Sequence, residues 1–480
     1  MKNIGLVLSS IVIMMYFGCA AEEATEARKQ AAAKENTQKI SVAEARAIAE
    51  EAYVFSFPML MGYRYGFATF LMPSLPSYKG PMNGIYGEAV TLDHNFKDVI
   101  TPNADTPYSM AMLDLRAESV VIQVPEVSGR YYVMQFVDLF GTNPHYVGTR
   151  VTGTKAGTYL AVGPRWDGKD GDGFDGVLRF ETDLVFLIGR TQLLGTDDAP
   201  ALSKVMKSYK VQPLSAYRDQ TGPAPASMQW PVWNDEASRD ERFIGYVNFL
   251  LQFCQPTHPS EIEMMKRFAR IGIAPGTAFD PEELDDGMRE ALRSGINDAR
   301  QKMATGMEKA AKKINGWMMS DAMGSREFFN GNYLLRAAGA MGGWGGNDKI
   351  EAFYPIARED SKGEPLDGAH RYRLKMTTPP PAKAFWSVTM YNTAYDGVAG
   401  YLVDNPINRY LINSTTQGLV RGEDGSLDIV IQRERPEAGP DQANWLPAPE
   451  GHFYLAFRIY QPEPAALDGT WTPPPVIRVQ

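Results

Sequence analysis

Residues 100–115 read ITPNADTPYSMAMLDL, a stretch in which polar side chains at turn-forming positions precede an apolar run. Each of its two prolines fixes its own φ and pushes the residue before it out of the helical region, while Asn and Asp can bond their own backbone. We therefore predict a rigid loop followed by a buried strand over 108–115. Asn103 and Asp105 would lie at the mouth of this strand, where scaffolds often hold reactive groups, or would merely close the turn.

Composition and charge indicate a globular protein. The chain has 480 residues, of which 44% are hydrophobic and 22% charged, and its net charge is -9. Such a chain is long enough to bury more than one hydrophobic core. Because Lys and Arg are not clustered, nucleic acid and anionic membrane surfaces are not expected as partners. We expect a small-molecule ligand or substrate, and a homo-oligomer is an open alternative.

The N-terminus indicates export. Lys2 is followed by a nearly continuous apolar run, which predicts that residues 1–18 form a bacterial signal peptide. The Gly-Cys junction at Cys19 resembles a lipoprotein cleavage box, so we predict acylation of Cys19, with an ordinary signal peptide as the alternative. Residues 19–40 are small and charged and predict a flexible tether. The protein would then be a periplasmic or cell-envelope lipoprotein, attached to the outer membrane only through its lipid anchor.

The folded part is predicted to begin with a helix. Ser41 opens a capping box, and apolar residues follow at helical spacing to Phe57. We predict that this helix ends before Pro58. The aromatic run over 57–70 either continues a kinked helix or lines a pocket, and in the second case Tyr53 and Phe57 are candidate ligand contacts.

Hydrophobic periodicity divides the rest of the chain into three parts. Residues 119–195 contain short runs separated by turn signals, which are typical of a sandwich or jelly roll rather than of βαβ units. Apolar residues then recur every three or four positions from Leu284 to Trp317, which predicts one long helix. The region 351–480 returns to a β pattern.

The fold class predicted from these patterns is α+β. It consists of two jelly-roll-like antiparallel β-sandwich domains, residues 41–199 and 351–480, with a long helical segment over 200–350 between them.

Several motifs of known chemistry are absent or rejected. The loop 167–176, DGKDGDGFDG, formally contains G-x-G-x-x-G, but it is acidic and precedes a strand-like run, so a dinucleotide site is not predicted. Calcium binding by this loop is an alternative to a solvated loop. The chain has 5 His, no two of them close in sequence, and neither a G-x-S-x-G elbow nor a P-loop. We therefore predict no metal centre and no cofactor.

Several stretches resemble known families. TPNADTPYSMAMLDL, SGRYYVMQFVDLF, VGPRW and LIGRT resemble the bacterial family called domain of unknown function 1254. YRLKMTTPPPAKAFWSVTMYN, NRYLINSTT, DGSLDIVIQ, NWLPAPEGHFYLAFRIY and LDGTWTPP resemble its usual partner, domain of unknown function 1214. The resemblance covers most of the mature chain and implies two domains with jelly-roll-like sheets, helical insertions and an exported location. It implies no established reaction.

Polar residues in neighbouring turns and strands of the first domain form the candidate site: Asn103, Asp105, Arg130, Asp138, Asn143 and His145. If Asp105 and Asp138 face one another, the pKa of one carboxyl rises while Arg130 holds the other ionised, which is the arrangement that acid-base hydrolysis requires. A structural ion pair between Arg130 and Asp138 is the alternative.

Two functions follow from this site. The predicted one is a hydrolase or lyase that acts on a small, fairly apolar molecule, with Asp105 and His145 transferring protons. The alternative is a non-catalytic envelope protein that binds a carbohydrate or an amphiphilic ligand. In both cases the side chains expected to contact the ligand are Asn103, Tyr108, Asn143, Tyr53, Phe57 and Trp386.

Overall fold

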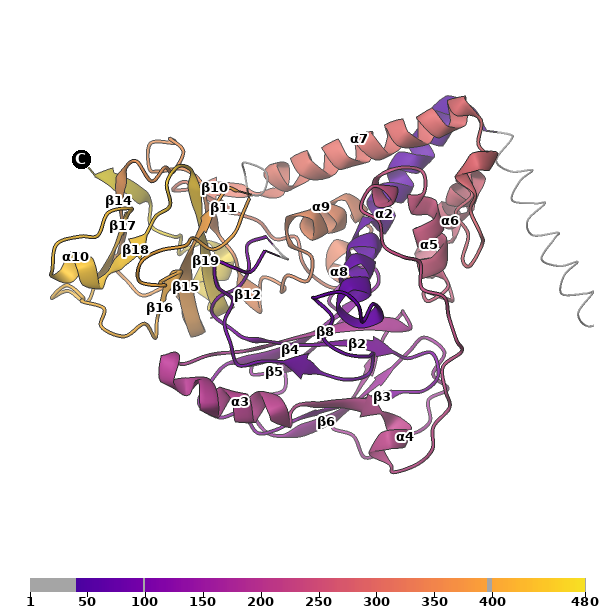
Figure 1. Ribbon diagram of the computed structural model, residues 1–480, viewed down its shortest axis with the longest axis horizontal. Helices are drawn as coiled ribbons and strands as arrows, with labels where there is room; N and C mark the ends of the chain where they lie inside the picture. The colour runs from indigo at the N-terminus through magenta and orange to yellow at the C-terminus, as the bar shows by residue number, and fades with distance from the viewer. Residues whose placement is uncertain (1–39, 98–99, 395–398, 480) are drawn as a thin grey trace, which may run out of the picture. The chain divides into compact units, whose positions relative to one another are not determined.

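The computed structural model describes residues 40–97, 100–394 and 399–479 (Figure 1). The chain forms two compact units: the first joins the residues up to Ser56 with Pro231–Gln301, and the second joins Phe57–Trp230 with Lys302–Gln480. Cys19 and the predicted signal peptide lie outside the described residues. No helix in the described part of the chain has the length and apolar character needed to span a bilayer.

The first unit is helical. Its elements are the N-terminal half of α2 (Val42–Gly66), α5 (Phe243–Leu251), α6 (Ile262–Phe268) and most of α7 (Asp286–Ala310), with the 3-10 turns η3 (Ala237–Arg239), η4 (Pro259–Glu261), η5 (Ala269–Ile271) and η6 (Pro281–Glu283). Ser41 Oγ caps α2 by accepting from the N–H of Glu44 at 3.2 Å. Gly295 lets α7 approach α2 closely, because a Cβ there would lie 2.3 Å from the carbonyl oxygen of Arg46.

The prediction that the first helix ends before Pro58 is wrong. α2 includes Pro58, runs to Gly66 and continues as the π-helical turn η1 (Phe67–Leu71). A proline inside a helix loses one backbone hydrogen bond. Met59, Leu60 and Tyr63 just beyond it are fully buried, and this burial offsets the loss.

The N-terminal β region of the second unit consists of two sheets. The first has the order β1 (Tyr86–Gly87), β2 (Tyr108–Asp114), β8 (Leu184–Thr191), β4 (Tyr132–Asp138) and β5 (His145–Gly148), and all its neighbours are antiparallel. The other has the order β7 (Gly176–Arg179), β6 (Gly157–Val162), β3 (Val120–Val124) and β9 (Lys210–Pro213), in which β6 and β7 run parallel.

The strands of the first sheet have two different faces. Side chains alternate along a strand, so Ala111 and Leu113 of β2 and Val185 and Leu187 of β8 join the core shared with the other sheet. The opposite face of the same two strands carries Tyr108, Met110, Ile188 and Arg190. A single buried cation therefore lies among apolar residues on the face that looks away from the core.

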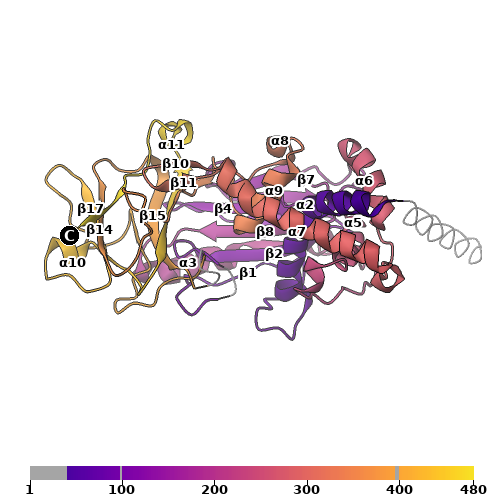
Figure 2. The ribbon, with the colours of Figure 1, turned by 90° about the horizontal axis from the view of Figure 1, so that it is seen from above.

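The C-terminal β region also has two sheets. The larger has the order β10 (Lys312–Ile314), β11 (Trp317–Met319), β13 (Ile356–Ala357), β19 (Phe453–Pro462), β15 (Ala382–Asn392) and β16 (Leu411–Asn413), with β12 (Ala352–Phe353) also paired to β19. The smaller has the order β18 (Trp445–Pro447), β17 (Leu427–Gln432), β14 (Arg371–Met376) and β20 (Val476–Val479). Residues of both sheets share one apolar core. In Figures 1 and 2 these strands, orange to yellow, lie together and apart from the purple strands of the N-terminal β region.

The helix predicted from Leu284 to Trp317 ends early. α7 stops at Ala310, and a hairpin of β10 and β11 follows, in which Ile314 faces Trp317 across the two-residue turn Asn315-Gly316. Both turn residues have positive φ, 54° and 82°. Asn-Gly is the preferred sequence for such a turn, and this local signal outweighs the helical spacing of the apolar residues.

The connector between the two β regions mixes helices and strands. It contains η2 (Thr196–Asp198), α3 (Ala199–Ser208), α4 (Leu214–Tyr217), α8 (Arg326–Phe329) and α9 (Tyr333–Gly343), and strands β9, β10 and β11 extend the sheets on either side. Two short helices, α10 (Pro440–Ala443) and α11 (Pro464–Asp468), follow in the C-terminal region. The chain is thus an α+β protein with antiparallel and mixed sheets.

Candidate functional site

The loop in front of β2 is closed by Asn103. Its Oδ1 accepts hydrogen bonds from the backbone N–H groups of Asp105 at 2.7 Å and Thr106 at 3.3 Å. Its Nδ2 donates to Thr106 Oγ1 and to Tyr460 OH, both at 2.9 Å. Asn103 therefore closes the turn and also fastens the loop to β19 of the C-terminal region.

Asp105 lies deep beneath this loop, with 3% of its surface exposed. Its Oδ2 accepts from Ser387 Oγ at 2.5 Å and from Tyr460 OH at 3.4 Å. Its Oδ1 is buried without a hydrogen-bond partner among the described residues. Burial raises the pKa of this carboxyl, while the positive charge of Arg458 and the side chains of Ser387, Asn413 and Tyr460 oppose the rise.

Arg458 comes from the face of β19 that looks away from its own core. Phe457 and Ile459 on either side of it belong to the apolar core of the two C-terminal sheets. The Arg458 side chain is 5% exposed, and its guanidinium donates to Thr389 Oγ1 at 2.9 Å and to the carbonyl of Thr101 at 3.2 Å. Arg458, a second buried cationic side chain on a strand, therefore contacts the loop that contains Asn103.

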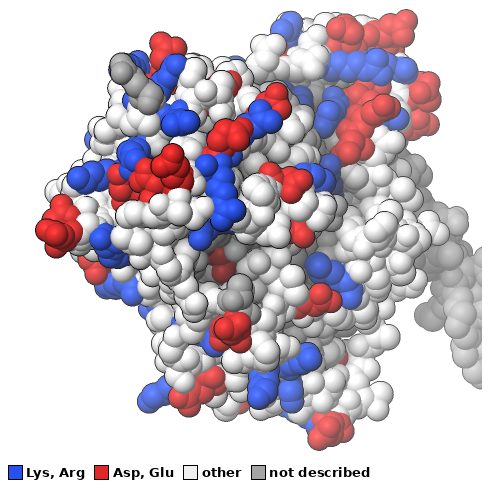
Figure 3. Space-filling model, turned by 60° about the vertical axis from the view of Figure 1, so that its left-hand side comes forward, with Lys and Arg blue, Asp and Glu red and all other residues white. Residues whose placement is uncertain are grey.

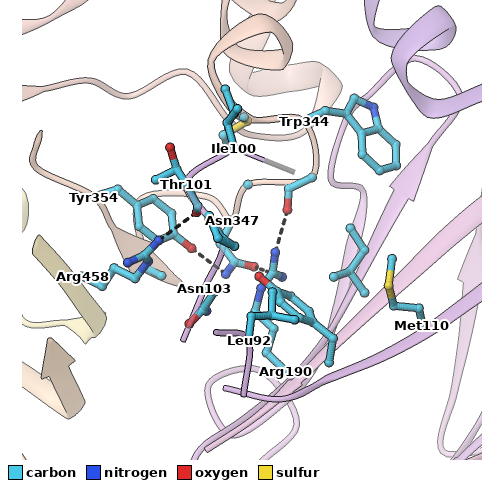
Figure 4. Close-up of a pocket in the computed structure, with 18 of the residues that line it drawn as sticks. Leu92, Ile100, Thr101, Asn103, Met110, Arg190, Trp344, Asn347, Tyr354 and Arg458 are labelled. Atoms are coloured by element: carbon cyan, nitrogen blue, oxygen red, sulfur yellow. Dashed lines mark hydrogen bonds between the residues drawn. The ribbon is translucent and has the colours of Figure 1, made fainter. Parts of the chain in front are cut away.

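A cavity of about 950 Å³ lies within the second unit (Figure 4). The outer face of β2 and β8 and the outer face of β19 both line it, together with residues 78–92 and the segment 339–347. Its apolar and aromatic lining is Tyr65, Tyr78, Ile85, Tyr86, Val90, Leu92, Phe96, Ile100, Pro102, Tyr108, Met110, Ile188, Ala322, Met323, Trp344, Ala352, Phe353, Tyr354, Ile356 and Ala456. Ligand pockets have this size and this predominantly apolar character.

Arg190 lines the same cavity from the N-terminal side. It is 6% exposed and donates to Gln135 Oε1 at 2.6 Å, to Asn347 Oδ1 at 3.2 Å and to the carbonyl of Gly345 at 2.8 Å. Its guanidinium also lies over the ring of Tyr108, 5.4 Å from the centroid. In Figure 4, Asn347 lies between Arg190 and Arg458.

Trp344 follows α9 and forms part of the cavity wall. Its indole stacks on Tyr65, with ring centroids 5.1 Å apart, and meets Phe186 edge-on at 5.0 Å. The next residue, Gly345, has φ 78°, and a Cβ there would lie 2.7 Å from Ile188 Cδ1. Only glycine fits this turn without strain, so the wall can lie directly against β8.

The structure does not assemble the predicted acid-base group. Arg130 binds Asp198 at 2.6 and 2.8 Å, and not Asp138. Asp138 accepts from the N–H and Oγ1 of Thr142 at 2.9 and 2.8 Å, and its burial raises its pKa to about 6. The expected pairing of Arg130 with Asp138 is thus wrong, because Arg130 pairs with Asp198 of η2 and Asp138 accepts from Thr142 in the turn after β4.

His145 is also separate from Asp105. Its Nε2 lies 2.8 Å from the carbonyl oxygen of Arg179, and its ring meets Phe180 edge-on at 5.2 Å. Burial lowers its pKa, which favours the neutral ring. None of Asp105, Asp138, Arg130 and His145 lines the cavity.

The residues predicted to contact a ligand divide into three groups. Asn103 and Tyr108 line the cavity. Asn143 supports its wall from behind, donating to the carbonyl of Gly346 at 3.0 Å and to Asp348 Oδ1 at 2.7 Å. Outside the lining lie Tyr53, which binds the carbonyl of Ser238 in the first unit, and Phe57 and Trp386, which are buried.

Sequence reasoning missed Arg190, Arg458, Trp344 and Tyr354. Both arginines interrupt otherwise apolar strand runs, in LIGRT and LAFRIY, and a charge at such a position was the available signal. The described residues contain no group of three or more His, Cys, Asp or Glu side chains that could hold a metal ion. On the face shown in Figure 3, acidic and basic side chains are interspersed.

Two family models match the chain. Residues 82–213 match the one described as "Protein of unknown function (DUF1254)", and residues 351–464 match the one described as "Protein of unknown function (DUF1214)". The chain carries these two domains in that order. Arg190 lies in the DUF1254 match and Arg458 in the DUF1214 match, so the cavity draws on both domains.

A solved crystal structure shares the fold. The VPA0106 protein from Vibrio parahaemolyticus, a crystal structure, is 25% identical, and the match covers 91% of this chain and 100% of that chain with a TM-score of 0.71. An uncharacterized protein from Burkholderia cenocepacia is 12% identical over 89% of this chain and 88% of that chain, with a TM-score of 0.44. No functionally curated protein matches the chain.

Proposed function

We propose that the DUF1254 and DUF1214 domains together bind a small amphiphilic molecule in the cavity between their sheets. The observation that carries this proposal is the cavity itself, about 950 Å³ in volume, with mainly apolar and aromatic walls and a few buried polar groups. Apolar walls supply affinity through burial, and a few fixed polar groups supply orientation.

A hydrolase or lyase is the second candidate, and one observation favours it. Asp105 is a buried carboxyl with a raised pKa and an unpartnered Oδ1, which are features of a catalytic acid or base. Against it, His145, Asp138 and Arg130 each have partners elsewhere and do not line the cavity. We therefore favour binding over acid-base catalysis.

Two further proposals rest on sequence and packing. We propose export and acylation at Cys19, because Lys2 and an apolar run precede the Gly-Cys junction. We also propose that each β region is a jelly-roll-like sandwich, which the apolar core shared by its two sheets supports.

The binding proposal is tested with a neutral, apolar fluorescent probe, N-phenyl-1-naphthylamine, added to the full-length protein. We expect saturable fluorescence enhancement in the wild type. Met110→Trp places a larger side chain on the half-buried cavity wall and should weaken probe binding about tenfold or more. Ile477→Trp, an equally large change at an exposed position of β20 outside the lining, should leave binding unchanged. Equal binding by all three proteins would contradict the proposal.

A further inference from the structure

The cavity contains two buried arginines that form no ion pair with a carboxylate among the described residues, although Asp105 acts on Arg458 electrostatically from beyond ion-pair distance. In the described part of the chain no Asp or Glu lies within ion-pair distance of Arg190 or Arg458, and their hydrogen bonds go to amide, hydroxyl and backbone oxygens. A buried positive charge is costly unless an anion compensates it.

Two other shielded arginines of the same unit are paired with carboxylates. Arg116 binds Asp114 at 2.7 Å, with 12% of its side chain exposed, and Arg130 binds Asp198 at 2.6 Å, with 9% exposed. The two cavity arginines differ from Arg116 and Arg130 in that their hydrogen bonds go to uncharged groups.

The charges around the cavity leave an excess of positive charge. Its lining includes four cations, Lys79, Arg190, Lys349 and Arg458, and two carboxylates, Glu88 and Asp321, and Asp105 below the lining adds a third carboxyl group that acts on Arg458. The ring of Tyr354 lies close enough to both guanidiniums for each of them to oppose the rise of its pKa caused by burial. Arg190 and Arg458 thus act on one region of the cavity, although they come from different domains.

We propose that Arg190 and Arg458 bind the oxyanion head group of an apolar acid, whose tail lies against the aromatic walls. The inference rests on the proposed function and narrows it from amphiphiles in general to acids. A guanidinium is suited to this task because its planar fork of N–H groups matches the geometry of carboxylate and phosphate oxygens. The bonds to Gly345, Asn347, Thr101 and Thr389 hold the two forks in place before the ligand arrives.

The test compares three compounds with the same tail. Decanoate, decyl phosphate and decanol are used to displace N-phenyl-1-naphthylamine from the full-length protein, each below its micelle concentration. We expect at least one acid to displace the probe at a concentration about tenfold or more below that of decanol, because charge-assisted hydrogen bonds are stronger than neutral ones. The acid that displaces the probe at the lower concentration then shows whether the site prefers a carboxylate or a phosphate head group.

Variants separate the head group from the tail. Arg190→Gln and Arg458→Gln should each reduce the advantage of the acid to about threefold or less, and the Lys variants should keep part of it. Met110→Ala changes the apolar wall and should weaken acid and alcohol by a similar factor. Thermal unfolding checks that each variant is folded. The comparison of the three compounds on the wild-type protein does not depend on any variant being folded.

Each outcome decides one question. Probe binding with equal displacement by decanol and both acids overturns the head-group inference and leaves the proposed function standing. An acid advantage that persists in both Arg→Gln variants also overturns it, since other groups would then bind the anion. Absence of probe binding to the wild type rejects the proposed function and the inference with it.

Discussion

Ser387 of β15 donates a hydrogen bond of 2.5 Å to the Asp105 carboxylate, joining a loop of the N-terminal β region to a strand of the C-terminal one. The two residues are 282 positions apart in the sequence. Asp105 thus lies at the contact between the two domains, below the cavity lining. Its hydrogen bond therefore stabilises the contact between the domains.

Removing this donor should destabilise the protein. Ser387→Ala leaves Oδ2 with Tyr460 OH at 3.4 Å and should lower the free energy of unfolding by about 1–3 kcal/mol, because a buried acceptor loses its partner. Denaturant unfolding measures the change. In an Asp105→Asn background the same substitution should cost less, since a neutral amide is cheaper to leave unsatisfied, and equal costs in both backgrounds would speak against the interaction.

Asp105→Asn also separates binding from catalysis. The amide oxygen can still accept from Ser387, so we expect the melting temperature and probe binding to stay close to wild type. Were a hydrolase or lyase substrate found, a loss of turnover on the order of a hundredfold with unchanged stability would establish Asp105 as an acid or base and contradict our preference for binding.

Asp138 should make stability depend on pH. Its pKa is raised from 3.8 to about 6, so its contribution to stability is fully present below pH 3.8 and is lost as the pH rises through about 6. Between pH 4 and pH 7 the wild type should lose up to roughly 3 kcal/mol relative to Asp138→Asn, from about 1.4 kcal/mol per pKa unit. Urea unfolding of both proteins across this range gives the difference. A constant difference would refute the assignment.

The Arg130–Asp198 pair should be structural. Arg130→Gln and Asp198→Asn should each lower stability, and a double-mutant cycle should give a coupling free energy of about 0.5–3 kcal/mol. Arg130 lowers the pKa of Asp198, so this stability should be lost as the pH falls through the lowered pKa of Asp198. Neither substitution should alter probe binding, because neither residue lines the cavity; a large change in binding would place Arg130 in the site.

Acylation is tested at Cys19. Cells fed an alkyne analogue of palmitate should label the wild-type protein, whereas Cys19→Ala should remain unlabelled. Cys254→Ala serves as the matched control and should be labelled like the wild type, since Cys254 is buried in the fold. Equal labelling of the Cys19 variant would contradict acylation at Cys19, and absence of label in both proteins would point to an ordinary signal peptide.

Sequence patterns predicted the local features of this chain. The apolar run after Pro107 predicted a buried β strand, and Ser41 predicted the start of α2. Two predictions fail because a second feature outweighs the local signal: the burial of the residues after Pro58 outweighs the tendency of proline to end a helix, and the Asn315-Gly316 turn outweighs helical spacing.

The candidate site was only partly accessible to sequence reasoning. Asn103 and Tyr108 could be chosen because they lie in and beside the proline-rich loop. Arg130, Asp138 and His145 are near Asp105 in sequence, but in the folded chain Arg130 binds Asp198 of η2, Asp138 binds Thr142 in the next turn and His145 binds the carbonyl of Arg179 in β7.

What the sequence by itself determined is the position of its turns and of its apolar strand runs, because these depend on the backbone preferences of a few neighbouring residues. The tertiary structure alone decided that Arg190 of β8 and Arg458 of β19 line one cavity. The two side chains come together through long-range strand pairing and through the packing of two sheets. The energetic effect of a buried charge also depends on partners that lie far away in the chain.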